Sequence, residues 1–255
     1  MAGIIRTCAR EIIANLLMGI PAIARRRIAA GRTSAPPTPE NARHALSIIL
    51  DNYSAIQPHI PGARIAEIGP GDHIATGLAL LACGADSYTA IDRFTGEYDN
   101  ATARAWYALV RAEWSAHFAT PFPPGLDGFP NIARVRVIRS GIENTGQLPE
   151  GAFDLVISNA VGEHVQDIDA FASSTHRLLT REGAALHNID FSSHGLFGDD
   201  ETFLKIPDPI WHLMGSNRGL PNRKRVDDFV RAFDAFEISV IPRSARSAGF
   251  MLRKK

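Results

Sequence analysis

Two glycines stand where a predicted strand gives way to a predicted helix. The segment 64–68 is short and mostly apolar, as a buried strand would be, and it leads directly into Gly69-Pro70-Gly71-Asp72. Glycine lets a backbone turn tightly and approach a ligand with no Cβ in the way. Because ligands of open α/β sheets bind at the carboxyl ends of the strands, this turn is expected to form part of a cofactor site.

The turn lacks the features of two common phosphate-binding loops. A dinucleotide fingerprint needs a third glycine three residues after the second, and Ile74 occupies that position. A P-loop needs Gly-Lys followed by Ser or Thr, and these residues do not follow the turn. The sequence therefore disfavours a nicotinamide oxidoreductase and a P-loop nucleotide hydrolase.

Two carboxylates indicate what the turn could bind. Asp92 lies 21 residues after Gly71, the usual distance to an acid that accepts hydrogen bonds from ribose hydroxyls, although a solvent-facing loop aspartate is the alternative. Glu67 ends the first strand, where an unpaired charge is costly and a cationic ligand group would offset that cost. A ligand with a ribose and a cationic amino-acid group but no phosphate describes S-adenosylmethionine rather than NAD.

A second group of polar residues follows the predicted strand 184–189. His187 and Asp190 are three residues apart, so they point to opposite faces of an ideal strand and would need a bend to meet. Histidine can take up a proton near neutral pH, so His187 and His194 are the predicted catalytic bases, with Asp190 orienting one of them. The same residues could bind a divalent metal. Because such groups more often hydrogen-bond a substrate, no metal is predicted.

Strands and helices alternate from residue 40 onward. This alternation predicts an α/β fold with an open, doubly wound and mostly parallel sheet that carries helices on both faces. The last two strands are joined by a polar turn and are expected to be antiparallel. The predicted strands cover 64–68, 87–91, 134–138, 153–157, 184–189, 236–241 and 248–253, and the predicted helices cover 41–56, 73–83, 98–118 and 167–180.

Residues 1–39 form a predicted basic and apolar helical extension and linker that precedes a catalytic domain over 40–255. Six arginines accompany one acid, Glu11, and the apolar run 12–20 is too short to cross a bilayer. The arginine triplet after this run does not fit a signal peptide. The extension is expected to pack over the domain or a partner subunit, as in a homodimer. An amphipathic helix on a membrane surface is the alternative.

The composition excludes several classes of protein. The chain has 255 residues, of which 45% are hydrophobic and 21% charged, close to the average for globular proteins. Lys plus Arg (27) balances Asp plus Glu (27), which argues against a dedicated nucleic-acid binder. Cys8 and Cys83 alone cannot form a disulfide framework or a cysteine-rich zinc site. A cytoplasmic protein is expected, with membrane association as the alternative.

Four motifs in order resemble class I S-adenosylmethionine-dependent methyltransferases, in the branch that acts mostly on small molecules. They are the glycine turn with its preceding glutamate, Ile91-Asp92, the segment 153–165 and the segment 176–183. The resemblance covers about residues 60–190 and implies a seven-stranded sheet with a reversed last strand. Gly162 departs from the family, which usually has a larger apolar residue there, and is expected to alter the wall that faces the substrate.

The resemblance also implies the roles of individual residues. The methionine portion of S-adenosylmethionine would contact the glycine turn, the ribose would contact Asp92, and the adenine would lie between Arg93 and Ile142. The methyl donor would lie above the end of the fourth strand. The residues assigned to the cofactor in this way are Glu67, Gly69, Gly71, Asp92, Arg93, Ile142, Asn159 and Ala160.

The acceptor side is predicted from a narrower resemblance. The segment 187–194 is similar to an HxIDxxDH segment of methyltransferases from saccharide gene clusters, and residues 191–235 are the predicted substrate lid. His164, Trp211 and Arg218 are the predicted acceptor contacts, with a purely structural role as the alternative for His164.

The sequence as a whole predicts methyl transfer to an oxygen or nitrogen of a small molecule, such as a saccharide or secondary metabolite. A non-catalytic cofactor-binding or membrane-docked module with the same fold is the alternative. A nucleic-acid methyltransferase is disfavoured because Ser158-Asn159-Ala160-Val161 replaces an Asn-Pro-Pro-Tyr loop.

Overall fold

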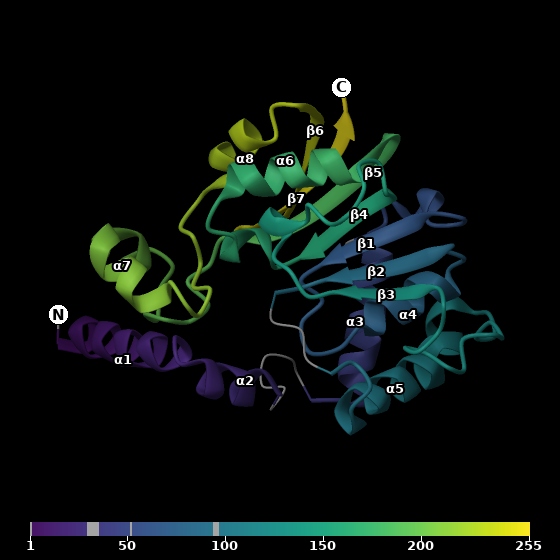
Figure 1. Ribbon diagram of the computed structural model, residues 1–255, viewed down its shortest axis with the longest axis horizontal. Coiled ribbons are helices and arrows are strands. Elements are labelled where there is room, and N and C mark those ends of the chain that lie inside the picture. The colour runs from purple at the N-terminus through teal and green to yellow at the C-terminus, as the bar shows by residue number, and fades with distance from the viewer. Residues whose placement is uncertain (1, 30–35, 52, 94–96) are drawn as a thin grey trace.

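The computed structural model describes residues 2–29, 36–51, 53–93 and 97–255, and its strands form one seven-stranded sheet (Figure 1). The strand order is β3-β2-β1-β4-β5-β7-β6. Only β7 runs against its neighbours, pairing antiparallel with both β5 and β6. This arrangement confirms the predicted fold class. The strands are β1 (Arg64–Ile68), β2 (Ser87–Ile91), β3 (Val135–Ile138), β4 (Phe153–Asn159), β5 (Leu179–Asp190), β6 (Phe236–Ser244) and β7 (Ser247–Lys254).

Helices cover both faces of the sheet (Figure 1). On one face lie α3 (Pro39–Asp51), α4 (Ala75–Ala82) and α5 (Ala101–Phe118), and on the other lie α6 (Ile168–Leu178) and α8 (Val226–Ala232). The central strands read as continuous apolar runs because both of their faces are buried. Short 3-10 helices complete the chain: η1 (Gln57–His59), η2 (Ile142–Asn144), η3 (Gly162–His164) and η4 (Thr202–Lys205).

The junction between α6 and β5 differs from the prediction. The sequence predicted a helix as far as residue 180 that ends because of Gly183, but α6 ends at Leu178 and Gly183 lies inside β5. A Cβ at Gly183 would come within 2.9 Å of Thr180 Oγ1 and 3.1 Å of the Asp154 carbonyl oxygen. Gly183 is therefore needed where two backbones approach closely beside an irregular strand pairing, and it does not end a helix.

The N-terminal helices α1 (Ala2–Met18) and α2 (Pro21–Ala29) extend from the sheet, and α1 lies beside α7 (Asp208–Gly215) (Figure 1). Asn15 is buried and joins the two helices. Its amide donates to the Leu213 carbonyl oxygen and to Ser216 Oγ, each at 2.9 Å, and its Oδ1 accepts from the Asn217 backbone at 2.7 Å. The extension thus packs on the chain's own domain, one of the arrangements that the sequence allowed.

The opposite face of α1 is apolar and uncovered. Ile5, Ile13 and Leu16 are exposed there, so contact with a membrane or a partner subunit stays a prediction. Among the helices described, none combines the length and hydrophobicity that a bilayer span requires. Part of the predicted linker, up to residue 35, lies outside the described residues.

The interface between α1 and α7 gives a first prediction. Asn15→Ala removes three hydrogen bonds and leaves their partners unsatisfied, which costs about 1–3 kcal/mol. We expect the amides of α1 to lose protection from hydrogen exchange while those of the sheet keep theirs. Ile13→Ala, on the exposed face of the same helix, is the control. Unchanged protection of α1 in Asn15→Ala would show that this residue does not hold the helix.

Candidate active site

A cavity of about 670 Å³ opens at the carboxyl ends of β1, β2 and β4. Its volume lies within the usual range for small-molecule and cofactor sites. The residues that line it are Met18, Ile68, Gly69, Gly71, Asp72, Ile91, Asp92, Arg93, Ser140, Gly141, Ile142, Glu143, Ala160, Val161, His164, Val165, His194, Arg218 and Gly219.

The glycine turn forms one wall and has little tolerance for other residues. Gly69 and Gly71 have φ values of 65° and 79°, in the left-handed region that favours glycine. A Cβ at Gly69 would lie 2.5 Å from Val161 Cγ2. The Gly71 N–H donates to Asp92 Oδ2 at 3.2 Å, so the turn after β1 is tied to the carboxylate after β2. The structure therefore brings together Gly69, Gly71 and Asp92 as predicted.

Glu67 lies behind the turn and does not line the cavity. It is 5% exposed, and the Tyr88 hydroxyl donates to its Oε2 at 2.5 Å. Burial raises the pKa of the Glu67 carboxyl to about 7, although the hydrogen bonds from Tyr88 and Thr76 oppose the shift. Glu67 lies directly before the glycine turn, so its predicted contact with the methionine portion stays a prediction. The cost of burial is met by neutral hydroxyl donors and by protonation, with no cationic ligand required.

Three predicted residues lie together at the end of the cavity formed by the loops after β2 and β3. Asp92, Arg93 and Ile142 line this end, together with Gly141 and Glu143. A Cβ at Gly141 would lie 2.6 Å from Glu143 Oε2, so a larger residue there would displace the Glu143 side chain. An acid, a guanidinium and an apolar face suit a ribose and an adenine.

The end of β4 contributes one of its two predicted residues. Ala160 lines the cavity, in a left-handed conformation with φ 54°, and its N–H donates to the Asn188 carbonyl oxygen at 2.8 Å. Asn159 continues β4 in register with Asn188 and does not line the cavity. The prediction that Asn159 lies beneath the methyl donor is therefore not supported by its position.

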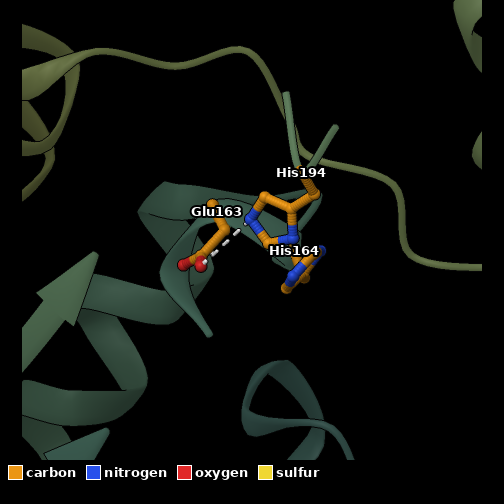
Figure 2. A group of neighbouring side chains, drawn as sticks. All are labelled: Glu163, His164 and His194. Carbon is orange, nitrogen blue, oxygen red and sulfur yellow. Dashed lines mark ion pairs between the residues drawn. The ribbon is translucent and has the colours of Figure 1, made fainter. Parts of the chain in front are cut away.

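His164 and His194 line the opposite end of the cavity, and Glu163 and Asp190 lie beside them without lining it (Figure 2). His194 Nε2 lies 3.7 Å from Glu163 Oε1 and 3.9 Å from Asp190 Oδ2. The rings of His164 and His194 stand edge to face, with centroids 4.9 Å apart. His164 Nδ1 lies 2.6 Å from the Gly219 carbonyl oxygen and therefore donates to it. Two of the predicted catalytic residues, His194 and Asp190, are thus brought together with the predicted acceptor contact His164.

Burial changes the protonation of this group. It lowers the pKa of His164 to about 4, with a further contribution from His194, so His164 is a neutral imidazole at neutral pH. It raises the pKa of the Glu163 carboxyl to about 8, and the nearby charge of Asp190 adds to the shift. Sequence reasoning missed Glu163 as a site residue, because nothing in its local pattern distinguishes it from a solvent-facing glutamate in a loop.

His187 belongs to the core and not to the cavity, so its predicted catalytic role is corrected. It is fully buried, its Nδ1 is 2.8 Å from Ser158 Oγ, and its Nε2 is 3.3 Å from Thr175 Oγ1. Burial lowers its pKa to about 3. Its ring packs between Phe171 and Phe233, at centroid distances of 4.6 and 5.8 Å. Both nitrogens are occupied, so His187 positions strands and helices in the core.

The packing of Trp211 and Gly162 in the core shows that neither residue forms part of the acceptor site. Trp211 lies in a buried cluster with Phe203 and Met214 and does not line the cavity, and its indole N–H donates to the Pro221 carbonyl oxygen at 3.0 Å. A Cβ at Gly162 would lie 2.7 Å from Ile189 Cδ1. Gly162 therefore faces the core and does not shape the substrate wall.

The wall near α7 comes from two distant parts of the chain. Arg218 lines the cavity as predicted and forms an ion pair with Glu11 of α1. Met18, at the end of α1, lines the cavity as well. Met18 could not be predicted from the sequence, because its place in the wall depends on how α1 packs against residues about 200 positions away.

The comparisons with known proteins agree with this geometry. Residues 66–187 match a family described as "Methyltransferase domain". A trans-methyltransferase named CalH, crystallised in complex with SAH, shares 18% identity over 85% of this chain with a TM-score of 0.50, and the chain covers 59% of its length. An S-adenosylmethionine-dependent methyltransferase from Mesorhizobium loti shares 15% identity over 81% of this chain and 97% of its own, also with a TM-score of 0.50. No curated protein sequence matches.

The sheet order and the glycine turn beside Asp92 define a Rossmann-like fold whose strand ends could hold an adenosine cofactor. With the matched domain over residues 66–187, they give the chain the fold of the class I S-adenosylmethionine-dependent methyltransferases. The residues present fit this cofactor. The turn at Gly69 and Gly71 has no side chains to fill the cavity, and Asp92 offers a carboxylate at its wall.

The buried carboxyl of Glu67 gives a prediction of pH dependence. Its pKa is about 7 in the folded protein and near 4.5 in the unfolded chain, so the folded state holds the proton more tightly. The free energy of unfolding should therefore fall by about 3 kcal/mol as the pH rises from 4.5 to above 7. Denaturant unfolding of Glu67→Gln should lack this component, since the amide does not titrate. An equal loss of stability with pH in both proteins would contradict the assignment.

Asp92 gives a prediction for the cofactor. Asp92→Ala removes the acceptor of the Gly71 N–H and of the ribose hydroxyls, so the affinity for SAM and for SAH should fall at least tenfold, since a hydrogen bond to a charged group contributes about 1.5–3 kcal/mol. Isothermal titration calorimetry measures this change. The control is Asp99→Ala, an aspartate whose ion pair with Arg104 is outside the cavity. Unchanged affinity in Asp92→Ala would remove the ribose assignment.

Proposed function

We propose that the enzyme transfers the methyl group to a hydroxyl oxygen of a small molecule, with saccharide hydroxyls as the acceptors to test first. The observation that carries the proposal is the group of Glu163, His164, Asp190 and His194 at one end of the cofactor cavity. A hydroxyl must lose a proton as it attacks, whereas an amine only needs to be neutral. Side chains that can take up or direct a proton therefore favour oxygen over nitrogen.

The size and charge of the protein support a small acceptor. The cavity has a volume of about 670 Å³, within the usual range for sites that hold small molecules. The net charge is zero, so no general field attracts nucleic acid. The saccharide class rests on the similarity of residues 187–194 to methyltransferases of saccharide clusters.

Residues at one end of the cavity would bind the cofactor, and residues at the other end would remove the proton of the acceptor. When bound, SAM supplies an activated methyl group: the acceptor oxygen bonds to the methyl carbon, the carbon–sulfur electron pair stays on sulfur, and the hydroxyl proton leaves to a base. Gly71 and Asp92 would hold the ribose, and Ala160 lines the cavity between them and the far end. There, the proton is taken up by the group containing His194 and Asp190. Alignment of the two reactants supplies much of the rate.

The segment 191–235 acts as the lid over the acceptor. His194, Arg218 and Gly219 of this segment line the cavity, and α7 carries the contacts to α1. Arg218 is held by Glu11, so α1 stabilises one wall of the acceptor region. The N-terminal extension therefore contributes to the structure of the acceptor site.

The role of His194 can be tested separately from cofactor binding. In His194→Ala we expect turnover to fall by about 10²–10⁴-fold, since a positioned proton acceptor contributes roughly this factor, while SAH affinity stays within about twofold. Turnover is measured as SAH released with a panel of hydroxylated and amine acceptors. His59→Ala, at an exposed histidine outside the cavity, is the control. Full turnover of His194→Ala, or reaction with amine acceptors alone, would contradict the proposal.

A further inference from the structure

We propose that Glu163, His164 and His194 form a binding site for a divalent transition metal, zinc in the first instance, at the acceptor end of the cavity. One donor atom from each residue lies within 4.8 Å of the others. Metal binding is argued from the geometry alone. Only the task assigned to the metal rests on the proposed methyl transfer to a hydroxyl.

The donor set suits a catalytic metal. Two imidazoles and one carboxylate form the set that holds zinc in several hydrolytic enzymes and leaves a coordination position open for water or substrate. Donors bound to one ion at about 2.0–2.2 Å lie roughly 3–4 Å apart, so the present separations are only slightly too long. The side chain of His194 is 32% exposed and comes from a loop, and its rotation can close the remaining gap.

Glu163 provides an independent sign that something is bound. It is 2% exposed, and no side chain that the structure describes donates a hydrogen bond to its carboxylate; the backbone N–H groups of Glu163 and Asp190 lie near it and oppose only part of the rise in its pKa. A partly satisfied buried carboxylate is costly, and buried charges are normally paired or coordinate a metal. Figure 2 shows Glu163 beside the two histidines, with a dashed line from its carboxylate to His194. The nearest of their nitrogens, His194 Nε2, is 3.7 Å away, which is too far for a hydrogen bond.

His164 already has the outer contact that a metal ligand needs. A carbonyl oxygen can only accept, so the 2.6 Å contact with Gly219 places the hydrogen on Nδ1 and leaves the lone pair on Nε2. Histidines that bind metals usually donate their other ring N–H to a carbonyl or carboxylate in this way, which fixes both tautomer and ring orientation.

A metal here would give the acceptor hydroxyl its reactivity. A hydroxyl bound at the open position loses its proton more readily, because the cation stabilises the resulting oxyanion. Asp190 lies 3.9 Å from His194 Nε2 and outside the three-residue set, so its carboxylate is placed to receive that proton. Before the proton moves, Glu163 and Asp190 together would supply two negative charges beside the cation, and afterwards the acceptor oxyanion would replace the charge that Asp190 loses.

In the test, the protein is first treated with a chelator that removes any bound metal. The chelator is then removed by dialysis, and zinc is titrated into the protein. Calorimetry should show one zinc per chain in the wild-type protein. Glu163→Gln and His194→Ala should each weaken that site at least tenfold, the loss expected when one ligand is removed. The matched controls are Glu201→Gln and His212→Ala, two exposed residues outside the cavity, and they should bind zinc like the wild-type protein.

Two outcomes would overturn the metal site. One is no saturable binding, and the other is equal zinc affinity in Glu163→Gln, His194→Ala and the wild-type protein. Thermal unfolding shows that each variant is folded, and Glu163→Gln keeps the shape of the side chain. The same dialysed samples are titrated with SAH, because failure to bind SAH would contradict the proposed function while leaving the zinc result interpretable.

Discussion

The site depends on one hydrogen bond between neighbouring strand ends, from the Gly71 N–H to the Asp92 carboxylate. Parallel pairing sets Ile68 opposite Ile91, so the loops after β1 and β2 start at the same level. The turn can then reach Asp92 only because Gly69 and Gly71 adopt left-handed conformations. This constraint leaves the space above the strand ends open and places a carboxylate at its wall, which are the two features that a ribose-bearing cofactor requires.

Ionisable side chains, in place of a glycine turn, surround the far end of the cavity. Its side chains come from the loop after β4 and from the segment after β5, and they bring a buried carboxylate close to two histidines. No side-chain donor contacts the buried carboxylate of Glu163, whereas the Tyr88 hydroxyl donates to that of Glu67. Two buried glutamates in one domain thus have different surroundings: a hydroxyl donor contacts Glu67, whereas His194 and Asp190 lie beside Glu163.

The fold and the cofactor end could be predicted because their signals are local. Apolar runs marked the central strands, and the glycine turn with Asp92 follows from the rule that strand ends meet at one edge of a sheet. His187 and Trp211 could not be separated from site residues in this way, since spacing does not reveal which face of an element meets the core. Met18 required the packing of α1 on α7, a contact between segments about 200 residues apart.

A crystal structure of the protein with SAH bound tests the central claim most directly. The account predicts that both ribose hydroxyls donate to the Asp92 carboxylate and that the sulfur points toward Ala160 and His194. It would be contradicted if the ribose lay away from Asp92, or if the sulfur faced away from the end of the cavity that holds Glu163 and the two histidines.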